Sequence, residues 1–261
     1  MYILISQSGE SIDTVLAMEK IKSSGNKVLC ITNNLNSTMY KEADYKFDIM
    51  AGREKAIAAT KTFSASVMML WILAVKIAQN KRIDITEETK NIYSIKQNMD
   101  NSIKDIDNLD LAAKFLAKKR GFSIAGLGLY YALSREMALK VKETSYLNTS
   151  AYPLGEFIHG HFALLNKENT FLTFMTSDCS DVELKLLNKI LTTYKTKSVI
   201  VSDVYEDYDC DILVKFQKGQ SKIANVMNMI ILIQLLALKI AQIKGRNVDS
   251  PRGLNKIVKG N

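Results

Sequence analysis

The chain has 261 residues, of which 47% are hydrophobic and 24% charged, and its net charge is +8. This balance excludes a disordered or collagen-like chain and provides enough apolar material for one large or two small cores. The three cysteines form no C-x-x-C pair and only two histidines occur, so we expect neither a disulfide framework nor a histidine-based zinc site. We expect a soluble, cytoplasmic protein without a metal or other cofactor.

Short apolar runs alternate with helical patterns in the first third of the chain. Strands are expected at Tyr2–Ser6, Lys27–Thr32 and Tyr45–Met50, and a long helix from about Glu54 to Asn80. Alternation of strands and helices predicts an α/β fold with a parallel sheet covered by helices.

The same pattern recurs in the second half. Strands are expected at Phe171–Met175, Ser198–Val201 and Asp211–Phe216, with helices at Val182–Ile190 and Lys222–Lys244. The two long helices even end alike, in LAVKIAQ and LALKIAQ. Such an internal repeat predicts two related domains. We place them at residues 1–80 and 110–245, joined by a helical connection over 81–109 and followed by a tail over 246–261.

The two copies are unequal. The second contains an additional strand at Phe122–Ala125, a turn at 126–128 and a helix at Tyr130–Tyr146. No counterpart of this unit precedes Tyr2. The first domain is therefore predicted to lack its opening strand–helix units, which leaves Tyr2–Ser6 without a partner on one side.

A polar loop, Ser6-Gln7-Ser8-Gly9-Glu10-Ser11, joins the first strand to its helix. Ligands bind α/β sheets at the carboxyl ends of the strands, and free N–H groups at a helix N-terminus attract anions. Three hydroxyls, an amide and a glycine suit a phosphate ester. The alternative is that Ser8 or Ser11 only caps the helix, which accounts for one serine but not for three.

Glu136, Lys140 and Glu143 share one face of the helix that follows Gly128. Taken alone, this spacing favours a solvated ladder of ion pairs. An irregular stretch, Asn148–Gly160, follows and concentrates scarce residue types. Since loops carry function disproportionately, this stretch makes a functional helix face more plausible than the ladder.

The most apolar runs, Val67–Val75 and Met229–Leu238, are far shorter than the roughly 20 residues that a membrane span needs. We expect both to be buried helices.

The lysines are spread along the chain without interleaved aromatic residues, unlike the pattern in proteins that bind single-stranded nucleic acid. We expect neither a nucleic-acid nor a membrane partner.

At these residues the sequence resembles the sugar-isomerase (SIS) family, in the branch that contains the isomerase half of glucosamine-6-phosphate synthase and stand-alone deaminases and deglycases. The matching stretches span nearly the whole chain and occur in the same order as in the family. Five stretches carry it: Ser6–Ser11, Ala58–Phe63, Ala138–Ser145, Gly155–Gly160 and Asp249–Lys256. It implies two SIS-type αβα domains and a homo-oligomer, at least a dimer.

The resemblance also implies where a phosphorylated sugar binds. The phosphate-binding residues would be Ser6, Gln7, Ser8 and Ser11. Ile57 and Asn255 would lie at the sugar, and the tail that contains Asn255 would fold over the active site.

Four residues receive catalytic roles from the same resemblance. Glu143 would move a proton between C1 and C2 of the sugar, and His159 would assist ring opening and reach the neighbouring subunit's site. Lys256 would approach the open-chain carbonyl, with a Schiff base as one option, and Lys140 would lie nearby. A carboxylate whose pKa is raised by burial can perform such proton transfer.

Three departures from the family qualify this expectation. The glutaminase half with its N-terminal cysteine is absent, because residue 2 is Tyr2. His161 replaces the usual proline after His-Gly, which would reshape the loop around His159. The opening units of the first domain are missing, including a hydroxyl-bearing loop that touches the phosphate in the family.

We therefore expect an isomerase or aminotransferase-type enzyme that acts on a hexose or hexosamine 6-phosphate by proton transfer between C1 and C2, without its own glutaminase. Alternatives are a deaminase or an Amadori 6-phosphate deglycase of the same family. A non-catalytic sugar-phosphate-binding remnant or a split subunit is a further alternative, favoured by the incomplete first domain.

Overall fold

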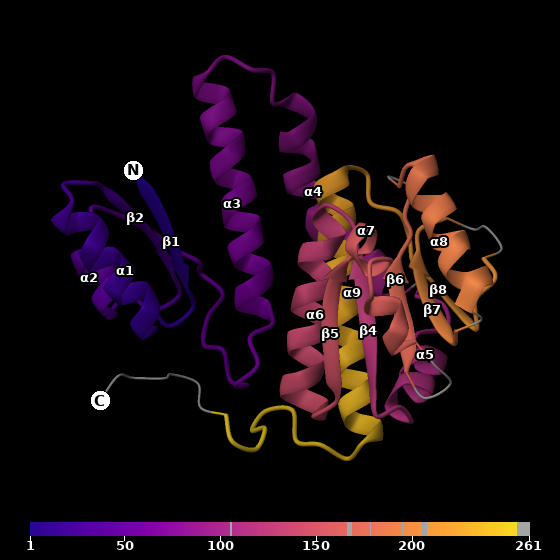
Figure 1. Cartoon of the computed structure of the whole chain (residues 1–261). Coiled ribbons are helices and arrows are strands. Elements are labelled where there is room, and N and C mark those ends of the chain that lie inside the picture. The colour runs from indigo at the N-terminus through magenta and orange to yellow at the C-terminus, as the bar shows by residue number, and fades with distance from the viewer. Residues whose placement is uncertain (105, 166–168, 178, 195, 205–207, 255–261) are drawn as a thin grey trace. The chain divides into compact units, whose positions relative to one another are not determined.

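The computed structural model describes residues 1–104, 106–165, 169–177, 179–194, 196–204 and 208–254 (Figure 1). The chain divides into two units. Unit 1 comprises Met1–Thr89 together with the tail from Asp249 onward, and unit 2 comprises Lys90–Val248. Each unit contains one parallel β-sheet with helices on both faces, so the class is α/β.

The sheet of unit 1 has three parallel strands in the order β1-β2-β3. Its strands are β1 (Tyr2–Ser6), β2 (Val28–Thr32) and β3 (Tyr45–Asp48), and its helices are α1 (Ile12–Ser23), α2 (Thr38–Glu42) and α3 (Lys61–Asn80). Ser6 pairs with Thr32, and Thr32 pairs with Asp48. The three strands therefore end level with one another, and their carboxyl ends present polar side chains along one edge.

Both faces of this sheet carry apolar residues. Met18 of α1 and Met39 of α2 pack with Cys30 on one face. On the other face, Leu29 and Ile31 pack with Ala65 and Met69 of α3. Burial of β2 from both sides explains its uninterrupted apolar sequence.

Helix α3 begins at Lys61, which corrects the expected start near Glu54. Glu54 is buried, and its carboxylate accepts hydrogen bonds from the N–H groups of Thr60 and Thr62 at 3.3 and 3.1 Å. It also accepts one from the Thr62 hydroxyl at 2.6 Å. A carboxylate that binds the first N–H groups ends the helix on the N-terminal side, because those groups have no partner within the helix.

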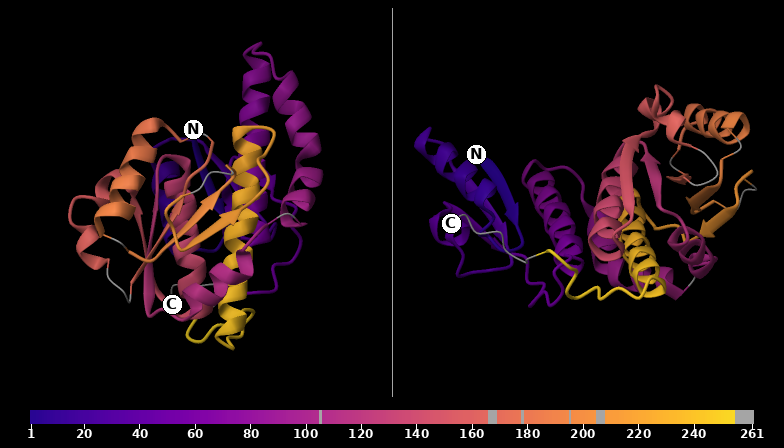
Figure 2. Two further views of the ribbon diagram at one scale, coloured as in Figure 1. Left: turned by 90° about the vertical axis from the view of Figure 1, so that its right-hand side faces the viewer. Right: turned by 60° about the horizontal axis from the view of Figure 1, so that its bottom comes forward.

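The sheet of unit 2 has five parallel strands in the order β5-β4-β6-β7-β8. They are β4 (Gly121–Gly126), β5 (Asn148–Pro153), β6 (Thr170–Phe174), β7 (Ser198–Ser202) and β8 (Ile212–Lys215). The helices are α5 (Leu109–Ala117), α6 (Leu129–Ser145), α7 (Leu154–Phe157), α8 (Asp181–Tyr194), α9 (Lys222–Ile243) and a 3-10 turn at His161–Leu164, and α4 (Thr86–Lys104) crosses the boundary between the units. Helices α8 and α9 lie on opposite faces of the sheet (Figure 2).

Strand β5 corrects one sequence-based expectation. Asn148–Gly160 was expected to be irregular, but its first six residues form β5 and pair in parallel with β4. The run contains Asn148, Ser150 and Pro153, which are poor strand formers. Pairing with β4 and packing against α6 override that local preference.

The internal repeat is visible strand by strand. Strands β1, β2 and β3 of unit 1 correspond to β6, β7 and β8 of unit 2, and helices α1 and α3 correspond to α8 and α9. Among the residues that the structure describes, unit 1 shows no counterpart of β4, β5 or α6.

Helices α3 and α9 are long and apolar enough to cross a membrane, by length and composition alone. They differ in burial: 67% of the most apolar stretch of α9 is buried, but only 17% of that of α3. The expectation of two buried helices is therefore wrong for α3. In unit 2, α5 and α6 both pack on α9, whereas the described part of unit 1 has no counterpart of these helices.

Gly126 allows β4 and α6 to approach closely. A Cβ at this position would lie 2.5 Å from the carbonyl oxygen of Tyr130, which is backbone and cannot rotate away. We predict that Gly126→Ala lowers the free energy of unfolding by about 1–3 kcal/mol, as overpacking of a core does. Thermal unfolding would show this as a fall in Tm of several degrees.

Gly155 provides the matched control, because a Cβ there meets nothing within 4 Å and its backbone needs no positive φ. Gly155→Ala should leave Tm nearly unchanged. Equal Tm values for the two variants would contradict the close approach at Gly126.

Candidate functional site

The polar loop after β1 is held together by its own hydroxyls. The Gly9 N–H donates to the Ser6 hydroxyl at 3.0 Å, and the Glu10 N–H donates to the Ser8 hydroxyl at 3.2 Å. The hydroxyls of Ser6 and Ser11 lie 3.3 Å apart. Ser6 and Ser8 are buried, whereas Ser11 is exposed. The structure therefore gathers three hydroxyls at the carboxyl end of β1.

Ser11 occupies the N-cap position of α1, but its side chain makes no capping hydrogen bond. Its hydroxyl faces that of Ser6 instead. Simple helix capping, the alternative function for these serines, is thus not what the structure shows for Ser11. The loop joins a strand end to a helix N-terminus, which is the arrangement that binds phosphate in α/β proteins.

Contacts with α2 fix the backbone of this loop. The Glu10 carboxylate accepts hydrogen bonds from the N–H and the hydroxyl of Thr38 at 2.8 and 3.0 Å. Gly9 has a positive φ of 64°, and a Cβ there would lie 2.2 Å from the hydroxyl oxygen of Ser37. Only glycine fits at this position without a shift of the neighbouring chain.

An open pocket of about 740 Å³ lies at this edge of the unit 1 sheet. Gln7 and Ser8 line it together with Asn33, Arg53 and Glu54. Asn33 is the first residue after β2, and its side-chain amide donates to the Gly52 carbonyl at 2.7 Å and accepts from the Ala51 N–H at 3.0 Å. The pocket thus borders the polar loop, and Asn33 anchors its wall.

Unit 2 contains the equivalent loop, but a carboxylate of the same unit fills it. Ser177 stands three residues before Ser180, the residue that precedes α8, just as Ser8 stands three residues before Ser11, the residue that precedes α1. The N–H and hydroxyl of Ser177 donate to the Asp203 carboxylate at 2.7 and 3.0 Å, and Asn225 donates to it at 2.9 Å. Asp203 is the first residue after β7, the place that Asn33 takes after β2. The repeat therefore contains two equivalent polar loops. The loop of unit 2 already binds the carboxylate of Asp203 from the same unit.

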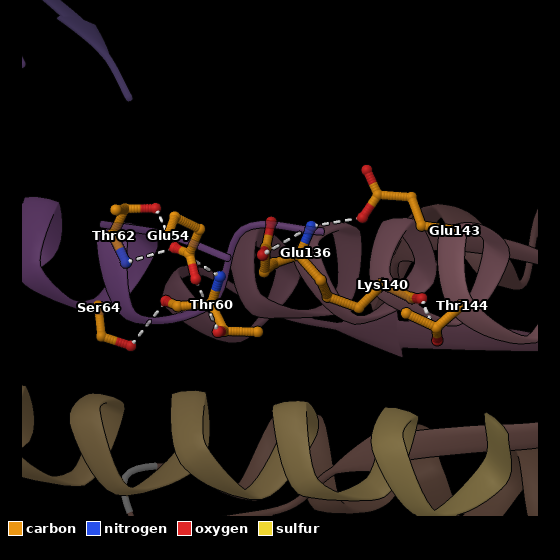
Figure 3. Close-up of polar contacts among 8 residues, drawn as sticks. All are labelled: Glu54, Thr60, Thr62, Ser64, Glu136, Lys140, Glu143 and Thr144. Atoms are coloured by element: carbon orange, nitrogen blue, oxygen red, sulfur yellow. Dashed lines mark hydrogen bonds and ion pairs between the residues drawn. The ribbon is translucent and has the colours of Figure 1, made fainter. Parts of the chain in front are cut away.

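Helix α6 buries a lysine between two glutamates (Figure 3). Lys140 is 4% exposed, and its Nζ lies 2.7 Å from Glu143 Oε2 and 3.5 Å from Glu136 Oε1. A solvated ladder would leave the lysine in water. Burial of Lys140 excludes the ladder that the spacing alone favoured, and it holds the Glu143 carboxylate in a defined position.

Burial raises the pKa of Glu136, against the opposing effects of the Lys140 charge and hydrogen bond. The raised pKa is the behaviour expected of a carboxylate kept out of water. The sequence places Glu136 on the charged face of α6, but the predicted site residues do not include it. Its position four residues before Lys140 is the sequence feature that indicates contact with the buried lysine, because residues at this spacing lie on one helix face.

The apolar stripe of α6 positions these charges. Leu133, Met137 and Val141 are buried on the side of the helix that packs on the sheet and on α9. The apolar stripe and the charged residues occupy different faces of the same helix. Packing of the stripe therefore determines which way the face that carries Lys140 is oriented.

The two histidines lie in different surroundings. His159 is exposed between α7 and the 3-10 turn, and its N–H donates to the Glu156 carbonyl at 2.9 Å. The ring of His161 contacts that of Tyr152 in a tilted arrangement, with ring centroids 4.0 Å apart. Gly160, between them, adopts a φ of 119°, a backbone conformation that favours glycine. The replacement of proline by His161 thus adds a ring contact that proline could not make.

The remaining predicted residues belong to unit 1. Ile57 is half-buried, and its N–H donates to the Asp249 carbonyl at 3.2 Å, which joins the loop before α3 to the start of the tail. Asn255 and Lys256 lie outside the described residues. The structure therefore divides the predicted site residues into a phosphate set on unit 1 and an acid–base set, Lys140, Glu143 and His159, on unit 2.

Glu54 is a further unit 1 residue that sequence analysis missed as part of the site. Figure 3 shows its carboxylate directed at Thr60 and Thr62. It lines the pocket and fixes the loop that contains Ile57. The helical pattern expected from Glu54 onward concealed this role, because it placed Glu54 inside a helix.

The chain is similar to known proteins over most of its length. A family model described as SIS domain matches residues 1–76 and 115–210. The chain is 32% identical over 264 residues to the isomerizing glutamine–fructose-6-phosphate aminotransferase of Campylobacter jejuni and 34% identical over 278 residues to that of Helicobacter pylori. These alignments cover 99% of this chain but 43% and 44% of the relatives. The chain therefore spans less than half the length of the curated relatives that it matches.

Solved structures show the same fold. The C-terminal domain of glucosamine-fructose-6-phosphate aminotransferase from Francisella tularensis has a TM-score of 0.88 at 30% identity, covering 95% of this chain and 72% of that chain. Glucosamine-6-phosphate deaminase from Thermotoga maritima has a TM-score of 0.76 at 24% identity, covering 98% and 74%. The latter likeness shows the fold alone.

The raised pKa of Glu136 leads to a pH-dependent prediction. Its pKa in the folded protein lies above the ordinary value of 4.5, so the native state holds this proton to higher pH than the unfolded chain does. The contribution of Glu136 to stability is therefore lost as pH rises from about 4.5 through the raised pKa. Glu136→Gln removes that loss, so its free energy of unfolding should gain on the wild type as pH rises.

Urea unfolding between about pH 4 and 7 measures this difference. Glu19→Gln, at an exposed position of α1, is the control and should follow the wild-type pH profile. A Glu136→Gln profile parallel to that of the wild type would show that burial does not perturb this carboxyl group.

Proposed function

Because this chain belongs to the SIS domain family, whose domains bind phosphosugars, we propose that it is a phosphosugar isomerase acting on a hexose or hexosamine 6-phosphate. The observation that carries the proposal is the buried Lys140 held between Glu136 and Glu143. A surface used only for binding gains little from a buried charge network, since burying charges costs several kcal/mol per ion.

In this proposal, the polar loop of unit 1 binds the phosphate. The hydroxyls of Ser6, Ser8 and Ser11 and the N–H groups at the start of α1 supply neutral donors. Hydrogen bonds to a charged group are roughly twice as strong as those between neutral groups. Unit 2 does not compete for the phosphate, because the Asp203 carboxylate already occupies its equivalent loop.

Glu143 is the proposed base. Its carboxylate takes the proton from C2 of the open-chain aldose and returns it to C1, while the hydroxyl proton moves to the new alcohol oxygen. The reaction is an internal redox exchange between two carbons and needs no external oxidant. The ion pair with Lys140 orients the Glu143 carboxylate, and a fixed orientation is one requirement for a general base.

His159 and Lys256 retain their proposed roles in ring opening and at the carbonyl. His159 is exposed, which is compatible with service to a neighbouring subunit in a dimer. The tail that leads to Asn255 and Lys256 starts beside Ile57, and this contact supports its proposed position over the site. Deaminase and Amadori deglycase activities use the same acid–base set and remain variants of this proposal.

The three-stranded sheet of unit 1 favours one alternative, a module that binds phosphosugars without turning them over. The alternative keeps the polar loop of unit 1 but assigns no chemistry to Glu143. Assays of binding and of turnover on the same variants separate the two.

Replacement of two serines tests the phosphate site. We predict that Ser8→Ala combined with Ser11→Ala weakens fructose 6-phosphate binding by about 100-fold or more, because each hydrogen bond to a charged group contributes about 1.5–3 kcal/mol. Binding of unphosphorylated fructose should change little. Isothermal titration calorimetry measures both.

Ser180→Ala is the matched control, because Ser180 precedes α8 as Ser11 precedes α1 and its hydroxyl bonds Glu183 at 2.7 Å. This variant should bind fructose 6-phosphate like the wild type. Equal losses for the phosphorylated and unphosphorylated sugars would refute the phosphate assignment.

Glu143→Gln tests the proton transfer. We predict a fall in turnover of about 10²–10⁴-fold with fructose 6-phosphate affinity largely retained, as removal of a general base causes. Exchange of the C1 and C2 protons of the sugar phosphate with deuterated water, followed by NMR, reports the step directly. Glu19→Gln should exchange at the wild-type rate, and unchanged exchange in Glu143→Gln would reject Glu143 as the base.

A further inference from the structure

A second pocket, of about 320 Å³, lies within unit 2 at the amino ends of its strands. Gly121 and Asn148, the first residues of β4 and β5, line it together with Arg120 and Asn169, the residues just before β4 and β6. Leu164, the last residue of the 3-10 turn, lines another side. This volume is at the lower end of the range for ligand pockets, roughly 300–1,000 Å³. The amino-end pocket is therefore large enough for a small molecule.

The amino-end pocket and the Lys140 network lie on opposite faces of the unit 2 sheet. The Thr149 hydroxyl donates to the Ala138 carbonyl of α6 at 2.9 Å, so Thr149 faces α6. Neighbouring residues of a strand face opposite sides, which directs Ser150 away from α6. Ser123 pairs in register with Ser150 and shares its face. Ser123 and Ser150 both line the pocket, which is thus separate from the proposed acid–base residues of α6.

Ser123 brings a hydroxyl without a protein partner to the wall of this pocket. The residue is 6% exposed, and no described residue forms a hydrogen bond with its hydroxyl. Ala125 on the same strand face and Phe171, its partner in register on β6, belong to the apolar core beneath α8. A buried polar group without a partner is unfavourable, because it has given up its hydrogen bonds to water. A molecule bound in the pocket would supply the partner that Ser123 lacks.

The rest of the wall combines neutral polar groups with one rigid apolar surface. Half-buried Ser150 adds a second hydroxyl. The ring of Tyr152 lies 5.6 Å from that of Phe157 and 4.0 Å from that of His161, between centroids, and these contacts hold it in place. Hydroxyl groups of a ligand suit the two serines, and its carbon atoms suit the Tyr152 ring.

Arg120 gives the pocket a positive charge. Its side chain is exposed, and no described residue forms an ion pair with it. The two residues before it, Lys118 and Lys119, are also basic, whereas the described lining contains no aspartate or glutamate. A guanidinium binds a phosphate or carboxylate through two parallel N–H bonds. The charge therefore favours an anion over a neutral sugar or water alone.

We propose that the amino-end pocket binds a small hydroxylated anion. Its phosphate or carboxylate binds Arg120, its hydroxyl groups bind Ser123 and Ser150, and its carbon atoms lie against Tyr152. The proposed substrate phosphate belongs to the polar loop of unit 1, at the carboxyl ends of strands, so this is a second binding site. It is independent of the proposed isomerase activity.

Isothermal titration calorimetry tests the site on the full chain carrying Ser8→Ala and Ser11→Ala, which takes the proposed phosphate loop of unit 1 out of the measurement. We expect glycerol 3-phosphate or glycerate to bind with a Kd of about 1 mM or lower, and neutral glycerol at least about tenfold more weakly. The tighter of the two anions identifies phosphate or carboxylate as the preferred group. Amide NMR shifts of Ser123 and Ser150 should move during the titration.

Absence of saturable binding of both anions would overturn the proposal, as would binding that leaves the Ser123 and Ser150 shifts unchanged. Equal affinity for glycerol and both anions would overturn the assignment of an anion. Fructose 6-phosphate binding by the chain with both serines intact reports on the loop of unit 1 separately, so failure of one site is distinguishable from failure of the other.

Arg120→Gln tests the charge. This variant should bind the preferred anion at least about tenfold more weakly, because a hydrogen bond to a charged group is lost together with the attraction between charges. Arg135→Gln is the matched control, since Arg135 is an exposed arginine of α6, on the other side of the sheet. It should bind like the parent chain. Equal affinities of the two variants would show that Arg120 does not hold the anion.

Ser123→Ala tests the buried hydroxyl. It should weaken binding of the preferred anion about twofold to tenfold. Ser198→Ala is the control: Ser198 is 1% exposed and its hydroxyl likewise has no partner, but it does not line the pocket. Because neither hydroxyl has a hydrogen bond to lose, both variants should keep the Tm of the parent chain. Unchanged affinity in Ser123→Ala would show that the ligand does not reach Ser123 and would overturn the proposed site.

Discussion

Parallel pairing of the strands is the constraint on which the candidate phosphate site depends. Because all strands of a sheet point the same way, Ser6, Thr32 and Asp48 end side by side and the loops that follow them converge. Loops separated in sequence thereby line one pocket, with Gln7 and Ser8 from one connection and Asn33 from the next. Buried Glu54 also lines this pocket. Its carboxylate binds the first N–H groups of α3, so the helix begins at Lys61 and the residues before it form a loop.

The two copies of the repeat differ in the residue that follows strand β2 in unit 1 and its counterpart β7 in unit 2. After β2 stands Asn33, which uses its amide to hold the pocket wall; after β7 stands Asp203, whose carboxylate binds Ser177. A neutral amide leaves the hydroxyl loop available to an anion, whereas a carboxylate at the matching place satisfies it from within. The loop of unit 2 is thus closed by an internal carboxylate, and the proposed phosphate site places an external anion at the loop of unit 1.

Charge burial plays the corresponding role on unit 2. Lys140 could not remain buried without Glu143 and Glu136, since an unpaired ammonium in the protein interior is strongly unfavourable. The same arrangement raises the pKa of Glu136 through burial and keeps the Glu143 carboxylate beside a cation. Stability and the proposed chemistry thus depend on one side chain, and the apolar stripe of α6 holds it in place.

The sequence by itself determined the α/β class, the internal repeat and the residues of the polar loop, because apolar periodicity and the placement of Ser and Gly are local signals. It also identified the charged face of α6. Only the tertiary structure decided that Lys140 is buried, that Ser11 does not cap its helix and that α3 starts at Lys61. It likewise decided that Asn148–Pro153 forms a strand and that α3 remains exposed while α9 is buried. Each of these depends on which distant segment packs against the residue, and helical or strand spacing carries no information about that neighbour.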